Sequence, residues 1–295
     1  MDAKLRLVLA LVLAIREARF ARGISCVRCH STSVILWGLT AAGRQRYMCR
    51  GCNHTFSDLT GTPAAFIKRL DLWARYTEYM RDGLSLRAIA RLLGIHVSTS
   101  FRWRHRLAAP LRTFDVDTLR GWVELEMLWF AYSRKGERGL TNARRRGVPD
   151  RLFTDARPVR VILANDRTGN ATHAMFMAPL SSATFEKELV NRFVSCAGLV
   201  AGLGLMPVLR PIARKRAIPL VDARPGQLMP PRELAWSQLP ARKQAALLLD
   251  WLERFRGVAT KYLPNYLAWH CSLDRARRQR FESVLLRWPI SADGT

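Results

Sequence analysis

The stretch GWVELEMLWF, residues 121–130, places two acidic residues inside an apolar segment. In an extended strand Glu124 and Glu126 point to one face, and Val123, Leu125 and Met127 point to the other. A buried carboxylate is costly unless a cation or a hydrogen-bond donor meets it. Two glutamates in an apolar strand therefore indicate a metal-binding active site or the remains of one.

Short strands and helices alternate along the chain after this segment. The turn-forming sequence NDRTG at 165–169 predicts a hairpin between two of the strands. Tightly connected strands followed by strand–helix units predict a mixed α/β domain over residues 113–295. The pattern predicts strands near 122–130, 159–164, 171–177, 199–203 and 218–222, and helices over 183–195, 207–216 and 238–256.

Closer to the N-terminus, CVRC at 26–29 and CRGC at 49–52 form two C-x2-C pairs. Each pair brings two thiolates to one ion, and two pairs complete a tetrahedron around zinc. We therefore predict a structural Zn²⁺ ribbon with the ligands Cys26, Cys29, Cys49 and Cys52, which leaves no coordination position open for catalysis. Disulfides are the alternative interpretation of the same spacing.

The other candidate ligands are interpreted as bystanders. His30 and His54 lie beside the two cysteine pairs and would compete as zinc ligands. Cys196 and Cys271 have no partner at ligand spacing, so both are predicted to be thiols of the hydrophobic core.

The first 23 residues, MDAKLRLVLALVLAIREARFARG, resemble a signal peptide, but charged residues follow the apolar run at once. The run is also too short to span a bilayer. We predict a helix that packs on the ribbon, and we assign both to a domain over residues 1–62. The expected location is the cytoplasm, without a membrane partner.

Residues 63–112 have the periodicity of a helical module. The segment at 64–83 predicts one helix, and LSLRAIARLLGI at 84–95 predicts a second, with Ser85 as N-cap and Gly94 in the following turn. A third helix follows, which gives the helix-turn-helix pattern of DNA-binding proteins. A helical wheel places Phe101, His105 and Ala108 inward, and it predicts a DNA-binding face made of Thr99, Arg102, Trp103 and Arg106. A solvated basic helix in an ordinary bundle is the alternative.

The overall charge supports a polyanionic partner. The formal net charge is +25, and the isoelectric point is near 11.2, which favours double-stranded DNA. The basic segment at 133–157 contains Arg144, Arg145 and Arg146, which suit a phosphate channel. An exposed, solvated loop is the alternative interpretation of this segment.

Four motifs together resemble the bacterial insertion-sequence transposases that carry an N-terminal zinc ribbon. They are FSDLTGT at 56–62, FRWRHR at 101–106, GWVELE at 121–126 and FRGVATKYLPNYLAW at 255–269. The resemblance covers nearly the whole chain, and it implies a bacterial protein associated with the nucleoid. It implies a DDE-type, ribonuclease-H-like catalytic domain, so the expected fold is a multidomain α+β chain. It also implies DNA cleavage and strand transfer with two Mg²⁺ ions held by carboxylates.

The residues depart from the family pattern at the catalytic positions. In the first-strand motif, roughly G-x-V-E-x-D-E, Glu126 stands at the position of the catalytic aspartate and Met127 replaces the next acid. The resemblance places Leu203 at the second aspartate, within LVAGLG at 199–204. The segment at 235–255 lacks the family's Asn/His-rich stretch and has Leu249 where the family tends to carry Lys. Asp166, Asp222 and Glu233 remain alternative ligands.

Two functions of different classes follow. The first is a DNA-binding protein of the transposase family that recognises transposon terminal repeats. In this case the cleavage and joining of DNA are impaired or lost, and the protein is a pseudo-enzyme or a recruited regulator. The second is an active transposase that uses Mg²⁺ at Glu126, with Glu124 as a further candidate. The resemblance implies a homodimer as a further partner, although the sequence shows no heptad pattern that supports one.

Overall fold

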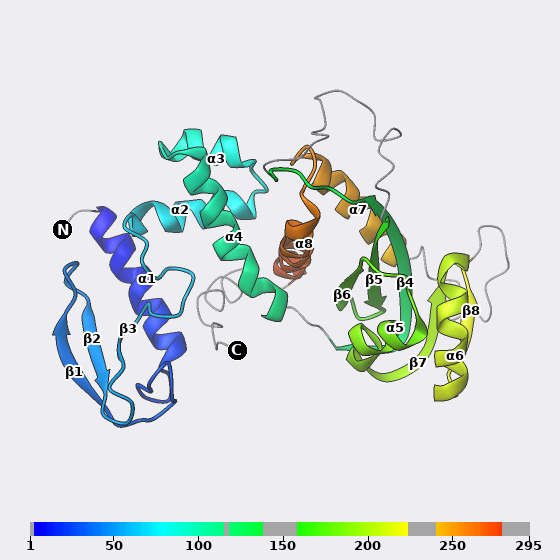
Figure 1. Cartoon of the computed structure of the whole chain (residues 1–295), viewed down its shortest axis with the longest axis horizontal. Coiled ribbons are helices and arrows are strands. Elements are labelled where there is room, and N and C mark those ends of the chain that lie inside the picture. The colour runs from blue at the N-terminus through cyan, green and yellow to red at the C-terminus, as the bar shows by residue number, and fades with distance from the viewer. Residues whose placement is uncertain (1–2, 115–117, 138–157, 224–239, 279–295) are drawn as a thin grey trace. The chain divides into compact units, whose positions relative to one another are not determined.

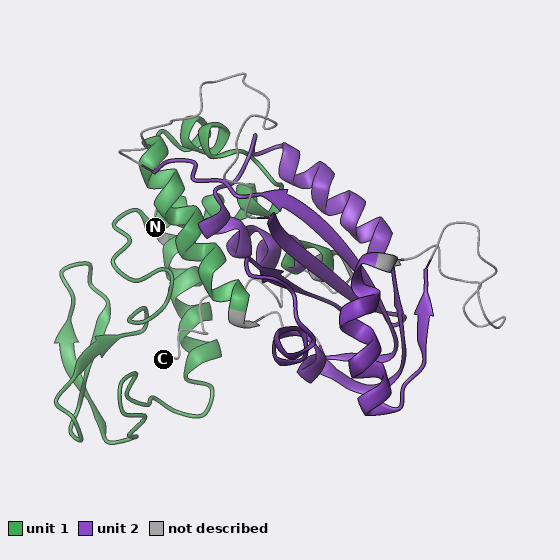
Figure 2. Cartoon of the chain, turned by 45° about the vertical axis from the view of Figure 1, so that its right-hand side comes forward, with its two compact units in different colours: residues 1–114, 272–295 green, residues 115–271 purple. Residues whose placement is uncertain are grey.

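The computed structural model describes residues 3–114, 118–137, 158–223 and 240–278. The chain divides into two compact units (Figure 2). The first contains Met1–Phe114 with Ser272–Thr295, and the second contains Asp115–Cys271. In the described residues no helix has the length and apolar content needed to cross a membrane.

The first unit begins with helix α1, Ala3–Arg19, followed by a small antiparallel sheet in the order β1-β2-β3 (Figure 1). The strands are β1 Val34–Leu39, β2 Gln45–Cys49 and β3 Thr55–Ser57. The predicted N-terminal helix is confirmed. The guanidinium of Arg19 at its end donates to the carbonyl of Asp58, 2.9 Å away, and the carboxylate of Asp58 accepts from the buried Tyr47 hydroxyl at 3.0 Å. The motif FSDLTGT therefore joins α1 to the core of the ribbon.

Three helices complete the first unit: α2 Leu70–Arg81, α3 Leu86–Leu93 and α4 Val97–Phe114. The two signals predicted around α3 are confirmed, since the Ser85 side chain accepts from the Ala88 amide and Gly94 adopts a left-handed φ of 62°. The helix predicted to start near residue 64 begins only at Leu70. The residues before it form turns, in which Phe66 has a φ of 57° that a helix does not allow.

The second unit contains a five-stranded sheet in the order β6-β5-β4-β7-β8. Its strands are β4 Leu119–Ala131, β5 Pro158–Asp166, β6 Ala171–Phe176, β7 Phe193–Ala201 and β8 Leu220–Asp222. Strands β4, β5 and β6 pair antiparallel, whereas β7 and β8 run parallel to β4. The hairpin at 165–169 and the expected mixed α/β sheet are confirmed, and the multidomain chain is α+β.

Apolar side chains cover one face of this sheet and pack against α5, Ser182–Glu188, and α6, Met206–Arg216. Val123 and Leu125 of β4 belong to this core, as the strand pattern predicts. Helix α7, Pro240–Glu253, packs on β4 and β5. Helix α8, Leu263–Arg278, contacts the sheet through the Cys271 sulfur, which lies 3.3 Å from His173 Nδ1 of β6.

One predicted helix is partly wrong. The helix expected over 183–195 ends at Glu188, a 3-10 turn covers Val190–Arg192, and β7 starts at Phe193. The apolar spacing of Leu189, Val190 and Phe193 suggested a continuing helix. All three are buried in the same core, but from a turn and a strand that pairs with Leu119. The α8 helix was not predicted.

Candidate functional site

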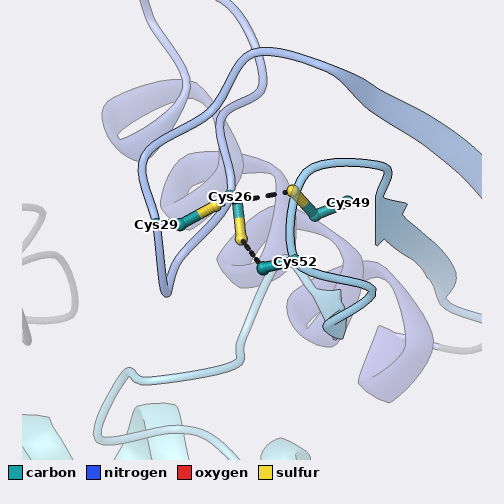
Figure 3. A group of neighbouring side chains, drawn as sticks. All are labelled: Cys26, Cys29, Cys49 and Cys52. Atoms are coloured by element: carbon teal, nitrogen blue, oxygen red, sulfur yellow. Dashed lines mark hydrogen bonds between the residues drawn. The ribbon is translucent and has the colours of Figure 1, made fainter.

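The four cysteine sulfurs of the ribbon converge, and all lie within 4.8 Å of one another (Figure 3). Two of the sulfur–sulfur distances, Cys26 to Cys52 and Cys29 to Cys49, are 3.6 Å. Four thiolates around a zinc ion with bonds of about 2.3 Å lie about 3.8 Å apart. The cluster therefore has the dimensions of a structural zinc site.

Both cysteine pairs adopt the same turn. In the first, the Arg28 amide donates to the Cys26 sulfur at 3.4 Å and the His30 amide donates to the Cys26 carbonyl at 2.9 Å. In the second, the amide of Gly51 donates to the Cys49 sulfur at 3.3 Å, and that of Asn53 donates to its carbonyl at 2.9 Å. His30 and Asn53 close the turns at positive φ, 59° and 55°. Backbone N–H donors aimed at sulfur favour the thiolate that zinc requires.

The electrostatics of Cys49 agree with this chemistry. Burial alone would raise the pKa of Cys49, but backbone N–H donors and the neighbouring thiols outweigh it and lower the pKa to about 7. At Cys52 the backbone N–H of His54 acts to lower the pKa, but burial and the neighbouring thiols outweigh it and raise the pKa to about 12, so the lowered pKa belongs to Cys49 and not to the whole cluster. A thiol that ionises near neutral pH binds zinc readily, because the ligand is the thiolate. In the described residues the four cysteines are the one group of at least three Cys, His, Asp or Glu side chains close enough to hold a metal ion, so His30 and His54 remain outside the ligand set.

Helix α4 presents part of the predicted basic face. Arg102 is exposed, and Thr99 and Arg106 are half-buried. Inward, Ala108 is buried as predicted, while Phe101 and His105 are half-buried and pack ring to ring at 4.4 Å. Burial and the nearby charge of Arg104 lower the pKa of His105 to about 4, so His105 adds no positive charge at neutral pH.

The prediction that Trp103 lies on the exposed face is wrong. Its side chain is 8% exposed and packs edge-on against Trp73 and Tyr76, with ring centroids 5.3 and 5.4 Å apart. Arg104, which the helical wheel did not single out, is fully buried and donates to the carbonyl of Leu84 at 2.5 Å. The buried side of α4 therefore differs from the one that the helical wheel predicts. Trp103, the largest side chain of the helix, packs against α2 and fills the space there.

The carboxylates of β4 lie on the sheet face that α7 covers. Glu124 is 3% exposed, and its Oε2 lies 3.5 Å from the backbone nitrogen of Ala241. Burial raises the pKa of Glu124, because few groups compensate its charge. Glu126 is half-buried, and its Oε2 lies 3.9 Å from Nε of Arg242.

Among the described residues, neither Asp166 nor Asp222 forms a group of three metal ligands with Glu124 and Glu126. Asp166 accepts hydrogen bonds from the side chains of Thr168 and Asn170 and from the backbone of Arg120, and these outweigh burial and lower its pKa. Asp166 is therefore explained by its turn. Leu203 begins the 3-10 turn after β7, and Asp222 ends β8. Glu233 and the arginines 144–146 lie outside the described residues.

Residues 22–53 match the zinc-ribbon family described as the InsA N-terminal domain. The chain is also 32% identical over 162 residues to a protein of Halobacterium salinarum described as an uncharacterized protein in transposable element ISH50. That match covers 52% of this chain and 53% of the relative, so the chain spans about half the length of the curated relative it matches.

Two solved structures of Mos1 transposase also align with the chain. One is a paired-end complex with the left transposon end, 12% identical, with a TM-score of 0.30 over 76% of this chain and 79% of that one. The other is a strand transfer complex, 13% identical, with a TM-score of 0.25 over 76% and 78%. TM-scores this low carry no argument about the function of the chain.

The fold and the cysteine cluster define a multidomain α+β protein with a structural zinc ribbon. The ribbon is of the InsA type, and the chain is similar to a protein encoded by a transposable element. The resemblance to insertion-sequence transposases is thereby confirmed.

Proposed function

We propose that this chain is a DNA-binding protein of the transposase family that recognises the ends of a transposon. The observation that carries the proposal is the helix-turn-helix of α3 and α4 next to an InsA-type zinc ribbon. In such modules the second helix enters the major groove, and arginine side chains contact phosphates or guanine edges. On α4, Arg102 is exposed and Arg106 is half-buried, and both are proposed to make such contacts.

The proposal includes three domains, with boundaries at residues 62 and 112. It also includes a homodimer. Thr99 is the third member of the proposed contact face, and Trp103 is removed from it because it is buried. The basic residues Arg144, Arg145 and Arg146 are proposed as further phosphate contacts. The net charge of +25 supports a polyanionic partner.

The proposal also holds that metal-dependent DNA cleavage is impaired or lost. Two-metal phosphoryl transfer requires several carboxylates that converge on the ions. The described residues contain no such group around Glu126, and the resemblance puts the apolar Leu203 at the second acid. In the sheet, β4, β5 and β6 pair antiparallel, and β7 and β8 run parallel to β4. This order supports the proposal that the domain descends from a ribonuclease-H-like nuclease.

DNA affinity measured across a salt series tests the binding part. The double substitution Arg102→Ala and Arg106→Ala is expected to weaken binding to the terminal repeats that flank the gene. It should also flatten the dependence of log K on log salt by about 0.9 for each phosphate that the variant no longer neutralises. The matched control is Arg210→Ala with Arg214→Ala, two exposed arginines at the same spacing on α6. Equal slopes for both double variants would place the DNA contact elsewhere.

A cleavage assay with Mg²⁺ or Mn²⁺ on the same DNA tests the catalytic part. We expect no cleavage by the wild-type protein. Turnover by the wild type that Glu126→Gln abolishes would instead establish an active transposase, whose carboxylates at β4 would be Glu126 and Glu124.

A further inference from the structure

The start of helix α7 makes three polar contacts with one face of the sheet. The backbone nitrogen of Ala241 lies 3.5 Å from Glu124 Oε2, and Nε of Arg242 lies 3.9 Å from Glu126 Oε2. Asn165 of β5, the cross-strand partner of Glu124, donates from Nδ2 to Gln244 Oε1 at 2.5 Å. Each of these three polar side chains of the sheet therefore faces a group on the first turns of α7.

These contacts have the charge that the carboxylates need. The amino end of a helix is positively polarised, and Ala241 belongs to the first turn of a helix of 14 residues. Arg242 adds a full positive charge beside Glu126. Arg242 thus compensates Glu126 as a bound cation would, whereas the single amide of Ala241 only partly compensates the buried Glu124.

The same arrangement fits Mg²⁺ poorly. Mg²⁺ takes six oxygen ligands in octahedral geometry and usually keeps several waters. Glu124 is 3% exposed under α7, which leaves it inaccessible to a hydrated ion, and an ion at Glu126 would meet the charge of Arg242. Asn165 Oδ1 is a buried acceptor with no hydrogen-bond partner among the described residues. One neutral oxygen does not offset these positive groups.

The geometry points to a structural role for this acidic face: Glu124, Glu126 and Asn165 dock the amino end of α7 onto the sheet, with Arg242 as the resident counter-ion in place of a divalent metal. The inference rests on the proposed loss of metal-dependent DNA cleavage, and it gives the two carboxylates a structural partner in helix α7. Arg242 is a positioning residue in this arrangement.

Hydrogen exchange of the full zinc-loaded chain tests the docking. Arg242→Ala is expected to raise exchange several-fold in the amides of residues 241–253, because α7 loses its anchor at Glu126. The matched control is Arg254→Ala, which removes an arginine just beyond the end of the same helix. Its ion pair, at 3.8 Å, is with Asp250 of α7 itself and not with the sheet. Equal exchange in both variants would overturn the docking role.

Titration with Mn²⁺, followed by its electron paramagnetic resonance signal, tests the counter-ion. The wild type is expected to bind no Mn²⁺ at millimolar concentration, and Arg242→Asp is expected to gain binding that Glu126→Gln removes in the double variant. Wild-type binding that Glu126→Gln or Asn165→Ala abolishes would overturn the inference in favour of a metal site, and so would an Arg242→Asp variant that gains none. Neither readout involves DNA, so a failed DNA-binding experiment leaves both results interpretable.

Discussion

The ribbon and the β4 strand each carry residues that the sequence marks for metal, but their surroundings differ. At the ribbon, four sulfurs from two cysteine pairs point at one another within 4.8 Å, and backbone amides are the donors around them. At β4, two carboxylates point at a helix end and an arginine. The first arrangement needs a cation from solution, and the second has protein groups that supply positive charge.

This difference shows that ligand type alone does not define a metal site. Zinc binding requires four donors in convergence, and the ribbon meets this condition. Glu124 and Glu126 share a face, as strand periodicity demands, yet their neighbours come from a helix more than one hundred residues later. The environment decides between a ligand and a docking group.

The strongest test of the comparison is to remove the zinc ligands. Cys49→Ala is expected to unfold the ribbon, because apparent zinc-binding energies of about 10 kcal/mol or more act as folding energy in such modules. Zinc content and hydrogen exchange over residues 24–57 measure the effect. The matched control is Cys196→Ala, a half-buried thiol of the second unit with no partner at ligand spacing. An intact, protected ribbon after chelation would contradict the zinc assignment.

A second test extends the comparison to the buried arginine of α4. Arg104→Ala is expected to lower the free energy of unfolding by about 3 kcal/mol, since it removes a fully buried side chain and its hydrogen bond to the Leu84 carbonyl. Urea denaturation measures the decrease. Arg102→Ala, two residues away and exposed, should change stability by no more than about 0.5 kcal/mol. Similar decreases for the two variants would show that the Arg104 hydrogen bond and packing contribute little.

The smallest expected effect concerns the charge of Glu124. Because burial raises its pKa above the unfolded value, the stability it contributes is present below the unfolded pKa and is lost as pH rises through the folded pKa. Glu124→Gln keeps an acceptor for the Ala241 amide and removes the charge. It should therefore stabilise the protein at pH 8 by on the order of 1 kcal/mol.

Urea denaturation of wild type and Glu124→Gln, both at pH 8 and at successively lower pH, measures this difference. The gain should shrink toward acid, where wild-type Glu124 is itself protonated. A variant that is less stable than wild type at pH 8 would mean that the ionised carboxylate has a partner stronger than the 3.5 Å amide contact.

Much of the local structure follows from short sequence patterns. The cysteine spacing predicts the ribbon, Ser85 and Gly94 mark the ends of α3, and NDRTG forms its hairpin, because each signal acts within a few residues. The helix predicted over 183–195 failed because Leu189, Val190 and Phe193 have apolar spacing that fits a helix and a turn-to-strand path equally well. Packing against Leu119 and its neighbours selects the second.

The sequence by itself determined the zinc ligands, the order of the helical module and the two faces of β4, because these depend on chain periodicity and ligand spacing. Only the tertiary structure decided that Trp103 and Arg104 are buried and that Glu124, Glu126 and Asn165 meet helix α7. The physical reason is that a side chain's solvation and charge partners come from segments distant in sequence, which the local pattern does not encode.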